Sequence, residues 1–442
     1  MSAALAAAYR LEKPAIYLLI LPLRLFHLWV NLPTFMFLVT LTAMLFRPPD
    51  LKSLPIDRIA FIALLLLMCV RLCIHREPLR TYPATWPLLA LMLIALWGVL
   101  TQPYDSTAWS GFAAKWVMPF VFFHIAGLVF RNGRALRKLE IFLLVVLAYL
   151  TVISILSFVG GKTFIFPHFI TDDGIGIHAD RARGPFLQAV ANGLCINLLG
   201  LVALDSFRRK VVRGLLAAVF FLAVPPALLA TKTRSVWIAS VLSVIYLVFL
   251  ASTPKLRRTA LAWCLLLAVG SGMLLLYRSD ANSLAQRAMD RSPVDFRTEM
   301  YQAGWQMFTE KPALGWGNEL RIQPEVERRV SGFHPEYYVF HNTFLELAVE
   351  RGLLGLGLYL WLMICLFRLR KSTGMAHEFG GPFSNSHFRK LWPLLLGVYL
   401  LNASAVVLNY QFVNALLFTI AGILAAQTSA SKPKPSLTSK FA

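Results

Sequence analysis

The chain has 442 residues, of which 57% are hydrophobic and only 15% are charged. This composition excludes an ordinary soluble domain and predicts that most of the chain lies in lipid. A backbone that crosses lipid must satisfy its hydrogen bonds internally, so we expect helices. The formal net charge of +21 could indicate nucleic-acid binding, but the basic residues lie between apolar segments and form no continuous patch with interleaved aromatic residues. We therefore expect no nucleic-acid partner.

The apolar segments predict about 12 transmembrane helices, since about 17 to 25 apolar residues are needed to cross roughly 30 Å of hydrocarbon. The predicted crossings are 31–46, 57–75, 85–101, 111–130, 138–160, 185–205, 212–230, 234–252, 258–277, 346–368, 389–408 and 411–427. A further stretch, 15–30, is interrupted by Pro22, Arg24 and His27. We expect it to lie in the interface or to form the bent start of the first crossing.

Charge asymmetry orients this bundle, because basic loops stay on the cytoplasmic side. With both termini in the cytoplasm, every dense basic cluster falls on that side; the clusters lie within 71–80, 131–138, 208–213, 255–258 and 368–390. The chain then divides into an N-terminal bundle, a large outer loop, a C-terminal group of helices and a cytoplasmic tail. Their bounds are 1–278, 279–345, 346–427 and 428–442.

The outer loop 279–345 is longer than a typical connection and is predicted to be folded and functional. Ser292, Pro293 and Asp295 are typical of a helix start, and apolar residues at helical spacing follow. Lys311-Pro312 and the turn 315–317 predict where this helix ends. A second short amphipathic helix is expected around 324–330.

Several cations lie at the predicted outer surface, where the positive-inside rule should remove them. They are Arg181, Arg183, Lys232, Arg234 and Arg297. Guanidinium groups match phosphate oxygens geometrically and stay charged when partly dehydrated, so together these groups predict a pyrophosphate site that needs no metal. The alternative is that they extend to lipid headgroups or pair with nearby aspartates; the candidate partners are Asp172, Asp173 and Asp180.

His341 stands between the outer loop and the next helix, ahead of Asn342 and Thr343 as capping residues. Imidazole can accept a proton from a hydroxyl near neutral pH, but such a histidine can also simply cap or pack. His334 is a weaker candidate for the same role. His168 and His178 lie in the other outer loop without metal-ligand spacing, so we expect no metal.

Other candidate chemistry is less well supported. The chain lacks the glycine-rich nucleotide motifs and the nucleophile elbow, which disfavours nucleotide-driven chemistry. Glu346, Glu350 and Arg351 lie about one turn apart near a helix start, and we expect them to pair with one another.

Five runs in this order resemble the O-antigen ligase and polymerase superfamily. They are Arg181 to Phe186, Thr231 to Trp237, Arg297 to Trp305, Glu310 to Gly317, and His341 to Gly355. The likeness covers about 180–360 in detail, and the remainder only in its number of helices. It implies an all-α polytopic glycosyltransferase of the GT-C type in the bacterial inner membrane, with the site facing the periplasm and no cofactor.

Family membership implies that arginines bind the pyrophosphate of an undecaprenyl-linked glycan and that a loop histidine assists the acceptor hydroxyl. Arg234, Arg297 and His341 match the family pattern directly. The family spacing selects Arg181, whereas Arg183 directly precedes the glycine, so both remain candidates. The family's asparagine-proline-asparagine is replaced by the run from Gln188 to Asn192.

Within this superfamily, one dominant loop and twelve crossings favour an O-antigen ligase that uses lipid A-core oligosaccharide as acceptor in lipopolysaccharide biosynthesis. Single-displacement transfer would invert the anomeric centre. The alternatives are an O-antigen polymerase, a protein O-oligosaccharyltransferase and, from another class, a lipid-linked glycan transporter or flippase. We expect a monomer in contact with membrane lipids.

Overall fold

The computed structural model describes residues 32–47, 55–76, 79–176, 178–249, 292–317, 319–330, 340–371 and 381–430, with isolated helical residues between 254 and 265. All regular elements in these ranges are helical, which confirms the predicted all-α class. The candidate His334 and the doubtful stretch 15–30 lie outside the described residues.

Six helices are long and apolar enough to cross a membrane within the described ranges. They are α2 (Ile56–His75), the continuous helix of α4 (Ser106–Phe112), η2 (Ala113–Val117) and α5 (Met118–Val129), α6 (Gly133–Val159), α7 (Ala189–Arg208), α14 (Thr343–Arg368) and α16 (Gln411–Ala430). Shorter apolar helices are Leu32–Leu45, α3 (Thr85–Leu100), α8 (Gly214–Ala230) and α9 (Arg234–Phe249). The remaining apolar segment near the C-terminus forms α15 (Ser386–Ala403).

These helices coincide with the predicted crossings except for 258–277, which lies largely outside the described residues. The polytopic class is therefore confirmed, whereas the total of twelve crossings stays a prediction because only six helices meet the length and hydropathy criteria.

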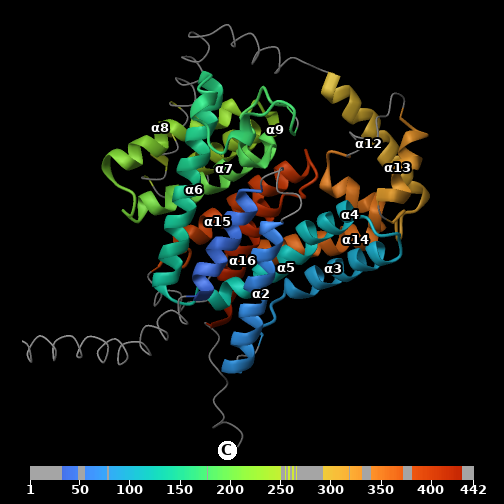
Figure 1. The fold of residues 1–442 in the computed structure, drawn as a ribbon, viewed down its shortest axis with the longest axis horizontal. Helices are drawn as coiled ribbons and strands as arrows, with labels where there is room; N and C mark the ends of the chain where they lie inside the picture. Colours follow the sequence, from blue (N-terminus) through green and yellow to red (C-terminus); the bar gives the residue numbers. More distant parts are fainter. Residues whose placement is uncertain are drawn as a thin grey trace, which may run out of the picture.

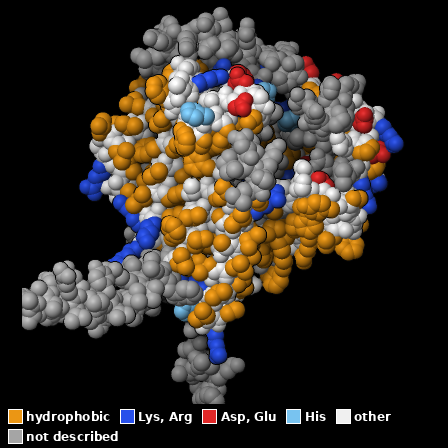
Figure 2. All heavy atoms as spheres, viewed as in Figure 1, with side chains coloured by type: hydrophobic (Ala, Val, Ile, Leu, Met, Phe, Trp, Pro, Cys, Tyr) orange, Lys and Arg blue, Asp and Glu red, His pale blue; other side chains and the backbone are white. Residues whose placement is uncertain are grey.

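The centre of the bundle is formed by α7, α5 and α16, which are largely buried by the surrounding helices (Figure 1). Close packing of α16 on α5 depends on Gly422, where an added Cβ would lie 2.1 Å from the carbonyl oxygen of Phe123. Small residues at helix contacts of this kind let backbones approach in lipid. Hydrophobic side chains cover the middle of the visible face in Figure 2, as expected for a surface in contact with lipid.

The predicted loop helix is confirmed as α12 (Ser292–Glu310), which lies beside α13 (Glu319–Glu327) across the view from α6 and α8 (Figure 1). The second prediction was wrong in its bounds, because α13 begins before 324 and contains Pro324 inside it. A small separate core joins α12, α13 and the start of α14; its members are Met300, Ala303, Met307, Ile322, Val326, Val330, Phe340 and Val349. The described part of 279–345 is therefore folded onto the bundle.

We call the end of the bundle that carries α12, α13 and the turns at 161–188, 230–234 and 404–411 the loop end. The opposite end carries the turns at 131–133, 209–213 and 369–371.

Candidate functional site

Arg183 lies inside the loop between α6 and α7 and is hydrogen-bonded to its backbone. Its side chain is 2% exposed, and its guanidinium donates to the carbonyl oxygens of Ile170, Asp172 and Ile175, with Nε 3.1 Å from the oxygen of Ile170. Backbone carbonyls of one loop thus occupy both edges of the guanidinium. Of the two arginines that the sequence left open, Arg183 therefore has an evident structural role.

Asn192 ends the run that replaces the family's asparagine-proline-asparagine, and its side chain donates two hydrogen bonds. Its Nδ2 donates to the carbonyl oxygen of Ala182 at 2.8 Å and to Oγ of Ser154 at 2.9 Å. The close approach requires Gly184, whose φ is +58° and where a Cβ would lie 2.7 Å from Oδ1 of Asn192. The amide of Asn192 therefore holds the arginine-containing turn against α6 and α7.

The α8–α9 hairpin is joined to that turn by the backbone. The N–H of Ala182 donates to the carbonyl oxygen of Ala230 at 3.0 Å, where α8 ends. Within the hairpin, the hydroxyls of Thr231 and Thr233 donate to local carbonyl oxygens at 2.7 and 2.9 Å, and Lys232 adopts φ +46°. Arg181, Lys232 and Arg234 therefore come from two turns that are held together.

The α12 helix is fixed to α14 by the glycine-rich turn that follows it. The N–H groups of Trp316 and Gly317 donate to Val349 and Glu350 at 2.8 and 3.0 Å, and Leu353 donates back to Pro312 at 2.7 Å. The family-like runs 310–317 and 350–355 thus bind each other. This contact holds Arg297, on α12, in a fixed relation to the start of α14.

The contact depends on a break in α14 at Gly352, which has φ +62° and ψ −159°. A Cβ there would lie 2.3 Å from the carbonyl oxygen of Ala313. Only glycine combines this backbone conformation with so close an approach.

His341 directly precedes the cap of α14. Asn342 is confirmed as the N-cap residue, because its Oδ1 accepts from the N–H groups of Phe344 and Leu345 at 2.9 and 3.2 Å. His341 itself has φ +51°, and its carbonyl oxygen accepts from the hydroxyl of Tyr301 on α12 at 3.2 Å. The cap and the tyrosine fix the backbone of His341 from both sides.

The electrostatic surroundings of His341 bring three segments together. Burial, then the charge of Arg297, then that of His178 lower the pKa of the imidazole to about 4. Such charge effects require close approach, so the loop 161–188 and α12 both reach the start of α14. At neutral pH the imidazole is uncharged, which leaves one ring nitrogen able to accept a proton.

The described contacts therefore connect His341 with α12, the helix that carries Arg297, and connect the turn of Arg181 with the hairpin that carries Lys232 and Arg234. Sequence reasoning missed His178 as a neighbour of His341, although its position in an outer loop was visible. It also missed Tyr301 as a residue that holds the histidine segment.

A partly buried ion pair joins the same segment to the helix that contains η2. Lys115 Nζ lies 2.8 Å from Oε1 of Glu346, with the two side chains 20% and 15% exposed. Sequence reasoning paired Glu346 with its own helix and did not foresee this cation from another helix. The signal was present in the sequence as a lysine inside an apolar crossing, where a charge is costly unless paired.

The π-helical turn η2 contains Lys115, and π-turns are frequent at functional sites. Such a turn frees backbone groups, and the carbonyl oxygen of Ala114 accepts from Nδ2 of Asn414 at 3.1 Å. The turn is thus satisfied by α16, and Lys115 is directed at α14.

Fold and site together define a polytopic α-helical membrane protein with a folded outer loop over a histidine and several arginines. Residues 217–360 match the family described as O-Antigen ligase, a range that includes Lys232, Arg234, Arg297 and His341. Residues 217–360 are thus O-antigen ligase-like, and the ligases and polymerases of that family are glycosyltransferase-type membrane enzymes. A search of curated proteins finds no match to the chain.

Proposed function

We propose that the protein is an O-antigen ligase of the bacterial inner membrane, which transfers a glycan from undecaprenyl pyrophosphate to a hydroxyl of lipid A-core oligosaccharide on the periplasmic side. The observation that carries this proposal is the position of His341 at the start of α14, held by Tyr301 of the helix that carries Arg297, in a region that matches the ligase family. A neutral base next to a fixed cation suits an acceptor hydroxyl that attacks a phosphate-bearing donor.

The transfer is a single displacement. The imidazole of His341 takes the proton of the acceptor hydroxyl while its oxygen forms a bond to the anomeric carbon. The bond from that carbon to the pyrophosphate oxygen breaks, and its electron pair leaves with undecaprenyl pyrophosphate. Arg181, Arg234 and Arg297, with Lys232, stabilise the departing charge, so no metal or nucleotide is required. One displacement inverts the anomeric configuration.

Membrane orientation is supported by the distribution of charge. In Figure 2, acidic side chains appear toward α12 and α13, whereas the rim near the lower ends of α6 and α8 carries basic ones. Basic residues favour the cytoplasmic side, so the loop end is proposed to face the periplasm.

The test uses purified full-length protein in lipid nanodiscs, with an undecaprenyl-pyrophosphate glycan as donor and rough lipopolysaccharide as acceptor. Wild type is expected to transfer glycan to lipopolysaccharide, whereas His341→Ala loses about 10² to 10⁴-fold in rate. Donor binding by the variant is expected to stay within twofold of wild type.

Product identity separates the rival activities. Growth of the glycan on its own lipid carrier, with lipopolysaccharide unmodified, would instead indicate a polymerase. Movement of the donor across the bilayer without transfer would indicate a flippase, and full activity of His341→Ala would exclude the proposed base.

A further inference from the structure

A groove beside the proposed transfer site carries the further inference. It lies at the loop end between the starts of α2, α4 and α16, and its cavity volume is about 770 Å³. Ligand pockets in proteins commonly have volumes of about 300 to 1,000 Å³, so a saccharide of a few residues fits. None of the residues given the proposed transfer roles lines this groove.

Both walls of the groove continue into the segments that carry the transfer site. One wall, 185–187, follows Arg181 and Arg183 directly in the chain. The other, 409–412, follows Leu408, whose N–H donates to Oγ1 of Thr343 at 3.1 Å, two residues beyond His341. The groove therefore lies where the arginine segment and the histidine segment meet.

A contact between side chains closes one side of the groove. The hydroxyl of Tyr410 lies 3.5 Å from Oε1 of Gln188, which follows the wall 185–187. The two walls are thus held at a set distance, and the groove is a built feature of the loop end.

The lining offers acceptors that the described part of the chain does not satisfy. Asp57 is 2% exposed, and its Oδ2 accepts no hydrogen bond there; Arg47 Nε lies 3.8 Å away, beyond hydrogen-bond distance. Oε1 of Gln411 on the opposite wall is likewise buried without a donor. A buried acceptor left unsatisfied costs about 1–3 kcal/mol, which a ligand with hydroxyl donors would recover.

The rest of the lining points to the same ligand chemistry. Arg47 and Arg58 present guanidinium groups suited to phosphate or carboxylate, and Ser110 adds a hydroxyl. Tyr410, which is only partly buried, supplies aromatic surface. A ligand that suits this lining has hydroxyl groups to donate to Asp57 and Gln411. It also carries an anionic group for Arg47 and Arg58, so an anionic saccharide fits.

We propose that this groove binds the sugar and phosphate portion of the acceptor and delivers one of its hydroxyls toward His341. The inference rests on the proposed transfer function and deepens it. It places the acceptor in the groove between α2, α4 and α16, while Arg181, Arg234 and Arg297 hold the donor.

The test compares acceptor and donor kinetics in Gln411→Met and Asp57→Asn, measured with the full-length protein in nanodiscs. Each substitution removes or alters one groove acceptor while keeping side-chain size. We expect the KM for rough lipopolysaccharide to rise about tenfold, which corresponds to about 1.4 kcal/mol. The kcat and the donor KM are expected to stay within twofold of wild type.

Gln102→Met is the matched control, because Oε1 of Gln102 is also buried without a hydrogen bond but does not line the groove. Its acceptor KM should equal that of wild type. An unchanged acceptor KM in both groove variants, or a change in donor KM instead, overturns the proposal.

A direct binding measurement keeps the groove testable if no transfer is observed. Deacylated rough lipopolysaccharide, which lacks acyl chains but retains sugars and phosphates, is titrated into the protein without donor. Binding should weaken about tenfold in Gln411→Met and persist in His341→Ala. If wild type binds only the intact acylated molecule, the groove recognises lipid and the saccharide proposal is wrong.

Discussion

Charged residues at the two ends of the bundle are arranged in opposite ways. At the end opposite the loop end, Glu140 and Asp205 are 0% and 2% exposed, and both pair with Arg209. Nε of Arg209 lies 2.7 Å from Oδ2 of Asp205. Asn385 also donates to Asp205 at 3.2 Å, and Arg137 pairs with Glu140. Two arginines and two carboxylates balance one another in this cluster, and its bonds tie α6, α7 and α15 together.

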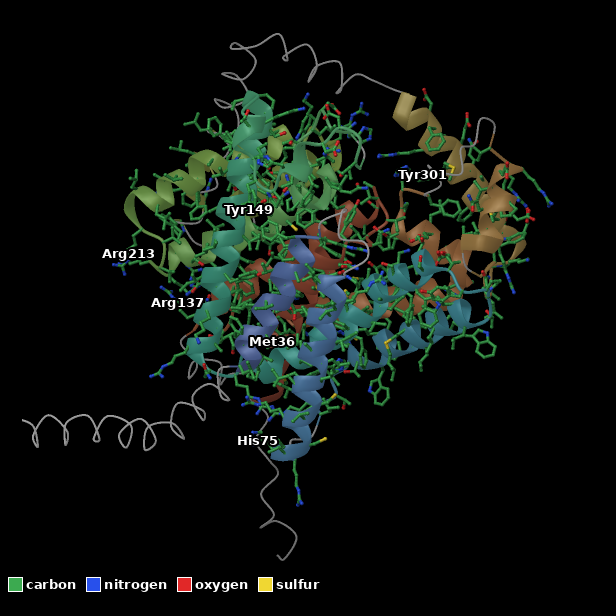
Figure 3. All side chains as sticks on the ribbon, in the orientation of Figure 1. Met36, His75, Arg137, Tyr149, Arg213 and Tyr301 are labelled. Carbon is green, nitrogen blue, oxygen red and sulfur yellow. The ribbon has the colours of Figure 1, made fainter. Side chains whose placement is uncertain are left out.

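At the loop end, by contrast, the charges that act on His341 are those of Arg297 and His178, both basic. Figure 3 shows the separation of the two regions, with Arg137 near one end of α6 and Tyr301 across the molecule on α12. The difference suits one cluster to stabilising the helices, whereas we propose that the other meets negative charge brought by a ligand. Substitutions at the two ends should therefore change different properties.

The largest effect on stability is expected for Arg209→Met. Removing this cation takes the paired arginine from buried Asp205 and leaves buried Glu140 with Arg137, and breaking a buried pair of this kind costs about 3–5 kcal/mol. Thermal unfolding in detergent should show the loss, while transfer per folded molecule at low temperature stays within twofold of wild type. Arg213→Met is the control, because exposed Arg213 bonds, within the described part of the chain, only the nearby carbonyl oxygen of Lys210. Equal stability of the two variants would contradict the comparison.

A smaller effect separates the two neighbouring arginines of the loop end. Arg183→Met removes the donors to three loop carbonyls, so proteolysis within 161–188 should become faster and stability should fall by about 2–3 kcal/mol. Arg181→Met should leave proteolysis unchanged and weaken donor binding about tenfold. Binding of undecaprenyl pyrophosphate and limited proteolysis measure the two effects, and the reverse pattern would exchange the proposed roles.

Gly352→Ala tests whether the contact between α12 and α14 positions Arg297. The backbone conformation at 352 is available essentially to glycine alone, so we expect a loss of about 1–3 kcal/mol. Transfer should fall as well, because α12 is released from the start of α14. Gly357→Ala, in the same helix with open space around its Cβ position, should cost nothing. A similar loss of transfer in both variants would show that the contact has no specific role.

The sequence was informative wherever lipid or a local turn determines structure. Apolar length predicted α2, α6, α14 and α16, and the Ser292-Pro293 start predicted α12. Contacts between distant segments could not be predicted from the sequence. Lys115 and Glu346 are 231 positions apart, so nothing near Glu346 in the chain indicates that Lys115 is its partner. The same holds for the role of Arg183, whose bonds to loop carbonyls depend on how 170–175 folds. Residue types were thus predictable, but not which of Arg181 and Arg183, both buried, would donate to the loop carbonyls.

The pKa of His341 gives the smallest and most direct test of the loop end. The folded pKa is about 4, below the ordinary value of about 6.5, so the folded state excludes a proton that the unfolded chain binds below pH 6.5. Stability contributed by the neutral imidazole is complete above pH 6.5 and is lost as the pH falls toward 4. Transfer that depends on the neutral base should stay flat from pH 7 to about 5.5.

His178→Asn removes one of the positive charges that lower this pKa, so the pKa of His341 should rise and the acid limb of kcat/KM should move to higher pH. His168→Asn, in the same loop, should leave the limb in place, because His168 does not act on His341. Histidine nitrogen NMR on the intact protein measures the pKa independently of turnover. A wild-type limb near pH 6.5 would mean that the imidazole is not held in the buried, cation-flanked position that makes it the proposed base.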